Sequence, residues 1–433
     1  MSRRRLLTGL GVLLGASLFT LKPVANIYAP NLQPFPDPSG TLKTYSTQGA
    51  IDLSNPFFQA LGTNGRSCAS CHVISDGWSV SAAHLQQRFQ ASQGLDPIFR
   101  PIDGANCPSA DVSTLEARTS AYSLLLNKGL IRMSLPVPEG AEFSIVAIND
   151  PYACAETTSS RPALYRRPLP ATSLRFLPAI MWDGREPNLS AQARTAILVH
   201  SQPTQLPTDA QLQQIVRFET SLFTAQSADN LAGSLTAKGA RGGPIFLSRQ
   251  TFFPGINPDG SNVFTLYSSW AGLDGSTPAA RRGSIARGEM LFNNRPMRIF
   301  DVSGFNDVRG QDIVFGTCGT CHNAPNVGSS SSFNLMNIGT ASLRTDLPAY
   351  TFLCTDGTQV LASDPGRALI TGKCADIGKF KVPSMRGLPA RAPYFHDGSA
   401  ATLLQVIDFY DQRFGMLLSQ EEKADLVAFM NSL

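Results

Sequence analysis

Two short stretches with the pattern Cys-x-x-Cys-His constrain this chain more than any other feature. We call residues 68–72 the first pentad and residues 318–322 the second pentad; their ligand-type residues are Cys68, Cys71, His72, Cys318, Cys321 and His322. Two thiols at this spacing reach the vinyl groups of a haem, and the adjacent imidazole ligates its iron. With 8 Cys and 5 His in 433 residues, chance predicts only about 0.002 copies.

A zinc site is the other reading of such a stretch, but one Cys-x-x-Cys pair needs a second pair of ligands nearby, which neither pentad has. The sequence therefore predicts two covalently bound haem c groups. His72 and His322 are the predicted iron ligands.

The N-terminus has the pattern of an export signal. Arg3–Arg5 precede an apolar run, Leu6–Leu21, which Lys22-Pro23 ends. A good small-x-small cleavage site is missing, so residues 1–29 are predicted to be either a signal peptide or a short N-terminal membrane anchor. Both predict a periplasmic protein, with membrane contact only through that anchor. The balance of 36 Lys+Arg against 32 Asp+Glu gives no reason to expect nucleic-acid binding.

Four cysteines remain outside the pentads, and an even number in an exported protein favours disulfides. Of the possible pairings we favour Cys107–Cys154 and Cys354–Cys374, because each closes a loop inside one haem unit. Buried unpaired cysteines are the alternative.

Each pentad lies in a stretch with helical patterns, which suggests a duplicated cytochrome c-like fold. The predicted fold is mainly α, with two cytochrome c-like haem domains, long loops and a minor β element near Ala141. The predicted domains are residues 30–229 (N-terminal, peroxidatic) and 284–433 (C-terminal, electron-transfer). A Gly/Ser/Pro-rich connection at 230–283 joins them.

Two further motifs carry a family resemblance: Trp182-Asp183-Gly184-Arg185, and the stretch KFKVPSMRGLPARAPYFHDGSAATLLQVIDFY at 379–410. Together with the pentads they resemble the bacterial di-haem cytochrome c peroxidase superfamily, which includes the MauG-type enzymes. The resemblance covers both pentads and most of 180–202 and 292–429. It implies that the N-terminal haem reacts with peroxide and that the C-terminal haem supplies electrons.

The resemblance also assigns residues around the first haem. Trp182 matches a tryptophan between the haems, a candidate electron relay, and Gln192 matches a glutamine on the peroxide-binding side. The family's catalytic glutamate falls at Gln202, a departure, because an amide cannot act as acid or base near neutral pH. His200 could transfer the proton instead. A distal iron ligand and a structural histidine are the other two readings of His200, and a core aromatic is the other reading of Trp182.

The sixth ligand of the second haem falls at Tyr410 by the same resemblance. Methionine stands there in the peroxidases and tyrosine in MauG-type enzymes; a phenolate stabilises Fe(III) and lowers the potential. Met416 is the alternative ligand, and Tyr410 as a core aromatic is a third reading.

An interdomain calcium ion is a further implication of the resemblance. Its candidate ligands are Asp103 or Asn106 with the carbonyls of Arg391 and Pro393. Arg391 replaces the family's usual threonine, and pairing with a haem propionate is its alternative role.

The implied function is a periplasmic oxidoreductase that reduces hydrogen peroxide with electrons from a small cytochrome c or cupredoxin. The alternatives are a MauG-like oxidase acting on a protein or organic substrate, and a non-enzymatic electron-transfer cytochrome.

Overall fold

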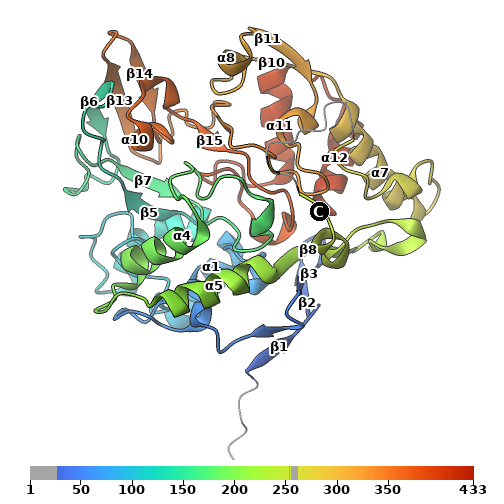
Figure 1. Ribbon diagram of the computed structural model, residues 1–433, viewed down its shortest axis with the longest axis horizontal. Helices are drawn as coiled ribbons and strands as arrows, with labels where there is room; N and C mark the ends of the chain where they lie inside the picture. The colour runs from blue at the N-terminus through green and yellow to red at the C-terminus, as the bar shows by residue number, and fades with distance from the viewer. Residues whose placement is uncertain (1–26, 253, 255–261) are drawn as a thin grey trace, which may run out of the picture.

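The computed structural model describes residues 27–252, 254 and 262–433. Residues 1–26, which make up most of the predicted leader, lie outside the described residues. Figure 1 shows the first half of the chain, blue to green, beside a second half in which the yellow α7 packs against the red α12, which also packs against α11. None of the helices in the described ranges has the length and apolarity needed to cross a bilayer.

Strands tie the start of the first half to its end. A four-stranded antiparallel sheet has the order β2-β3-β8-β9, and β1 pairs with β4 beside it. Residues of β3 alternate between buried and half-buried, the pattern of a strand with one face on a core. The strand bounds are Tyr28–Pro30 (β1), Pro34–Asp37 (β2), Gly40–Ser46 (β3), Ala50–Asp52 (β4), Leu222–Asp229 (β8) and Gly233–Ser234 (β9).

Helices of the first half surround the first pentad. α5 (Asp209–Ser221) begins at a capping box formed by Thr208 and Gln211 and buries Leu212, Ile215 and Phe218 at helical spacing. α4 ends in a π-helical turn, η5, which carries His200. The bounds of the others are Ala82–Ser92 (α1), Leu115–Ala121 (α2), Ser123–Lys128 (α3), Leu189–Ala196 (α4) and Ile197–Ser201 (η5).

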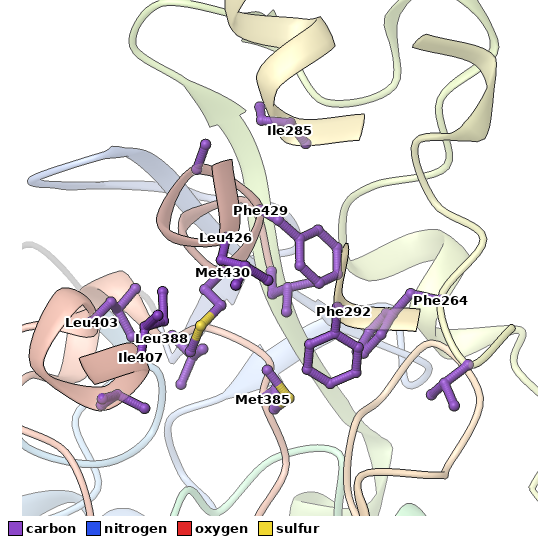
Figure 2. Close-up of a cluster of buried hydrophobic side chains, with 14 of the residues drawn as sticks. Phe264, Ile285, Phe292, Met385, Leu388, Leu403, Ile407, Leu426, Phe429 and Met430 are labelled. Carbon is purple, nitrogen blue, oxygen red and sulfur yellow. The ribbon is translucent and has the colours of Figure 1, made fainter. Parts of the chain in front are cut away.

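The second half is built on α7 (Ala279–Asn294) and α12 (Gln420–Asn431), which pack together around a large apolar core (Figure 2). Five apolar residues at positions 263–270 of the predicted connection belong to this core: Val263, Phe264, Leu266, Tyr267 and Trp270. Part of the predicted connection is therefore packed into the core of the second half. Other elements here are α6 (Pro244–Ser248), β10 (Met297–Phe300), α8 (Asn306–Arg309), β11 (Ile313–Gly316), α9 (Cys318–Cys321), α10 (Ala368–Thr371) and α11 (Leu403–Phe414).

The two halves share a sheet. Strand β6 (Phe143–Asn149) pairs with β13 (Ala349–Cys354), which also pairs with β14 (Gln359–Ala362), at the upper left of Figure 1. Two smaller pairs are β5 (Ile131–Ser134) with β7 (Ala163–Arg166) and β12 (Leu335–Met336) with β15 (Phe380–Lys381). The described residues thus form six small sheets. The prediction of a mainly α fold with a minor β element underestimated the strands, because two of the sheets depend on the long-range pairs β3–β8 and β6–β13 and many strands are only two to four residues long.

Both favoured disulfides are present. Cys107 is bonded to Cys154 and Cys354 to Cys374, and the four pentad cysteines are free.

A buried ion network also joins the halves. Arg166 donates to Asp364 at 2.6 and 2.8 Å and to Asp183 at 2.6 Å, and all three side chains are buried. Removing one partner of a buried pair leaves an uncompensated charge. We therefore expect Asp364→Asn to lower the free energy of unfolding by about 3–5 kcal/mol in urea titrations. Asp408→Asn, which breaks the exposed contact with Lys423, is the control and should cost less than about 1 kcal/mol. Equal losses of stability in the two variants would contradict the assignment of Arg166 and Asp364 as a stabilising buried ion pair.

Candidate functional site

The first pentad forms a short helical turn, η2 (Cys68–Ser70), that orients His72. The Ser70 hydroxyl caps this turn by accepting from the Ser67 N–H at 3.1 Å. The Nδ1 of His72 donates a hydrogen bond to the carbonyl oxygen of Trp78 at 3.0 Å. The centroid of its ring lies 6.3 Å from that of the Phe57 ring. The contact leaves Nε2 as the metal-binding nitrogen, the arrangement usual for histidine ligands.

The second pentad repeats this geometry with different residues. The Thr320 hydroxyl accepts from the Thr317 N–H at 2.8 Å. The Nδ1 of His322 donates to the Gly328 carbonyl at 2.6 Å, and its ring packs against Phe292 at 6.2 Å. Burial lowers the pKa of both pentad histidines, which favours the neutral form that ligates metals. The free thiols and the oriented histidines thus fit two covalent haems.

Buried cations give a second test of this fit. Four buried basic side chains have no carboxylate partner within the described residues: Arg132, Arg167, Lys381 and Arg386. None of the three guanidinium nitrogens of Arg386 makes a hydrogen bond in the described part of the chain. Arg386 and Lys381 line one small pocket with Ser173. Burial lowers the pKa of Lys381 to about 7 and that of Arg386 to about 10. Haem propionates would supply the negative charge that is missing beside Lys381 and Arg386.

His200 lies against the segment that leads into the first pentad. Its Nδ1 donates to Oδ2 of the buried Asp103 at 2.6 Å, and the other oxygen of Asp103 pairs with Arg66. Asn64 donates to the His200 carbonyl at 2.7 Å. Burial alone would raise the pKa of Asp103, but the hydrogen bond from His200 and the charge of Arg66 hold it below its usual range. The contact with Asp103 thus fixes the orientation of the His200 ring and leaves Nε2 as the ring nitrogen without a hydrogen bond in the described residues.

Gln192 and Gln202 occupy different surroundings. Gln192 lies half-buried in α4, and its side-chain amide makes no hydrogen bond within the described residues. Gln202 is exposed and ends η5 with a φ of 52°. Its carbonyl accepts from the Thr63 hydroxyl at 2.9 Å, and its side chain accepts from Asn64 at 3.4 Å. These two contacts of Gln202 therefore hold the end of η5 against the segment at residues 63–64, ahead of the first pentad.

Trp182 lies at the junction of the halves. Its indole Nε1 donates to the Arg167 carbonyl at 2.8 Å, and its ring is 6.2 Å from the ring of His396. His396 stacks on Phe380 at 4.0 Å, and its carbonyl accepts from the Arg167 N–H at 2.8 Å. An aromatic chain thus crosses the junction.

Tyr410 lies on α11 within reach of the second pentad. It packs on the core that includes Cys318 and Cys321, and its hydroxyl makes no hydrogen bond within the described residues. Burial raises the pKa of Tyr410, and the thiols of Cys321 and Cys318 raise it further. Met416 is buried in the same core. Both candidate ligands therefore stay near this pentad.

The candidate calcium ligands do not come together as an open site. Both oxygens of Asp103 are engaged by Arg66 and His200, and the Asn106 side chain bonds to Ser123 and to the N–H of Leu124. The Arg391 carbonyl accepts a hydrogen bond from the guanidinium of Arg167. These residues do not fit a calcium ion.

Sequence reasoning did not identify three residues that the structure adds: Asp103 as the partner of His200, Arg167 at the junction and the unpaired Arg386. Asp103 precedes its partner by 97 residues, so no local spacing could have linked the pair.

Comparisons with known proteins cover part of the chain. No family model matches the sequence. It is 32% identical over 130 residues to "Cytochrome c551 peroxidase" of Nitrosomonas europaea, covering 30% of this chain and 34% of the relative. It is 36% identical over 135 residues to "Cytochrome-c peroxidase IdrP2" of Denitromonas iodatirespirans, covering 27% and 36%.

The matched segments thus span about a third of these relatives. A solved MauG-like protein associated with microbial copper homeostasis aligns over 88% of this chain and 86% of its own, at 16% identity and a TM-score of 0.41. Over these matched segments, the sequence comparisons confirm the resemblance to the bacterial di-haem cytochrome c peroxidases.

Proposed function

We propose that this protein is an exported di-haem c-type oxidoreductase that reduces hydrogen peroxide to water. The observation that carries the proposal is the hydrogen bond between His200 and the buried Asp103 beside the first pentad. It supplies an oriented proton-transfer group two residues from the position where the family's glutamate is missing. Similarity to proteins named cytochrome c peroxidases supports the same reaction.

Peroxide reduction consumes two electrons and two protons and releases two waters as the O–O bond breaks. A haem held by Cys68, Cys71 and His72 would supply the iron chemistry of that cleavage. The Nε2 of His200 would accept the proton of one peroxide oxygen and return it to the other. Asp103 would stabilise the imidazolium formed between these transfers, because its carboxylate faces Nδ1.

Electrons would enter at the second pentad, from a small periplasmic cytochrome c or cupredoxin. The aromatic chain at the junction supports a path through Trp182, since its indole lies between elements of both halves. The proposed division into a peroxidatic domain at 30–229 and an electron-transfer domain at 284–433 follows from this direction of flow.

A second function is a MauG-like oxidation of a protein or organic substrate. Tyr410 favours it, because an anionic oxygen ligand on the second haem would stabilise oxidised iron. The third reading, an electron-transfer cytochrome, requires both irons to be permanently six-coordinate.

The test is to record electronic and EPR spectra of the purified holoprotein before and after adding peroxide. We expect a high-spin five-coordinate signal from one haem, loss of that signal on adding peroxide, and steady turnover with reduced cytochrome c. Two low-spin haems that ignore peroxide would exclude both enzymatic functions. A peroxide reaction without cytochrome c turnover would favour the MauG-like oxidation.

A further inference from the structure

The guanidinium of Arg167 is buried where the two halves meet, and three main-chain carbonyls converge on it. Its Nη1 donates to Lys128 at 2.6 Å, and its Nη2 donates to Val80 at 2.6 Å and to Arg391 at 2.8 Å. We call these three carbonyls the junction cage. Val80 follows the first pentad and Lys128 ends α3, whereas Arg391 belongs to the second half and ends the turn η9 (Pro389–Arg391).

A cage of this kind is a cation site. Converging carbonyl oxygens are the donors that hard metal ions take, and buried charges otherwise pair with carboxylates. Arg167 is 5% exposed and has no carboxylate partner within the described residues. Burial lowers the pKa of Arg167, and the charge of Arg391 adds to this, to about 9, so the group stays charged at neutral pH. The carbonyls of the junction cage therefore compensate its charge.

The backbone of the same residue holds the aromatic chain at the junction. The Arg167 carbonyl accepts from the Trp182 indole, and its N–H donates to the His396 carbonyl, both at 2.8 Å. Arg167 is thus fixed by its side chain and fixes two aromatic residues by its main chain. We infer that Arg167 is a built-in cation that joins the two halves in place of an exchangeable metal ion and positions Trp182 against His396.

This role of Arg167 does not depend on whether the haems reduce peroxide or carry out a MauG-like oxidation. Its first test uses the wild-type holoprotein after treatment with a chelator. We expect calcium to show no binding in isothermal titration and to move the thermal midpoint by less than about 1 °C. One calcium bound per chain at micromolar affinity, or a rise of several degrees, would overturn the inference.

The second test replaces the cation. Arg167→Gln should lower the thermal midpoint by roughly 5–10 °C, because three buried carbonyls lose their donors, and Arg167→Lys should lose less than half as much because it keeps a charge. The matched control is Arg175→Gln: Arg175 also donates to two carbonyls, those of Ser248 and Gln250, but from an exposed position. Calcium should raise the midpoint of Arg167→Gln and leave Arg175→Gln unchanged. Equal losses for the Gln and Lys variants of Arg167, or a loss no larger than in the control, would refute a cation role.

Discussion

Replacing His200 with glutamine is expected to lower the steady-state turnover of hydrogen peroxide about 10²- to 10⁴-fold, the usual contribution of general acid–base catalysis. Glutamine keeps a polar side chain but cannot take up and release the proton that passes between the peroxide oxygens. The measurement is the rate of oxidation of reduced cytochrome c, with the electronic spectrum of the resting protein recorded in parallel. The spectrum should stay unchanged, because in this assignment His200 is not an iron ligand.

The chain provides a matched control in His84. Its Nδ1 also lies against a carboxylate, Asp76, at 3.1 Å, and its side chain is 32% exposed against 35% for His200. His84→Gln should therefore change turnover less than about twofold, within the range of surface substitutions. A spectral change in His200→Gln would identify His200 as a distal ligand, and unchanged turnover would make it a structural histidine.

Tyr410→Phe is expected to raise the reduction potential of the second haem by on the order of 100 mV, since axial ligands set haem potentials over several hundred millivolts. Loss of a phenol oxygen ligand would remove a donor that stabilises Fe(III), so with Tyr410 as the sixth ligand the low-spin EPR signal of this haem should also change. Both are measured on the holoprotein, by potentiometric titration and by EPR.

Met416→Leu separates the two candidate ligands of this haem. Both residues belong to the core around the second pentad, so both substitutions perturb similar packing, but only the true ligand should alter the low-spin signal. A Tyr410→Phe protein with a wild-type spectrum, together with an altered Met416→Leu spectrum, would transfer the assignment to Met416.

The parts of this protein that could be predicted are those encoded by local spacing. The pentads and the long helices are set by residues within a few positions of one another, and the disulfide pairs by loops inside each half. Strand pairing was underestimated, because β6 finds its partner β13 about 200 residues later. Phe264, Tyr267 and Trp270 lie in a Gly/Ser/Pro-rich stretch that read as a connection, yet they are buried against α7 and α12.

The candidate site divides in the same way. The family resemblance selected Trp182, Gln192 and Tyr410, and His200 was chosen because it lies two residues before Gln202; the roles of all four stay predictions. The pairing of Asp103 with His200 and the contact of Arg167 with Arg391, 224 residues apart, depend on the folded chain alone. Gln202 indicated that the family's catalytic carboxylate is missing from this position. Only the fold shows that the carboxylate of Asp103 lies beside His200.

The sheet shared by β6 and β13 also sets the order in which this molecule can be assembled. Strand β6 has no partner until residues 349–354 have been made, and contacts of such long sequence separation close slowly. Leu433 contributes as well, because its carbonyl accepts from the N–H groups of Gln226 and Gly387. The first half thus gains its full set of contacts only after the second half has been made, and until then the first pentad belongs to a chain that has not yet closed.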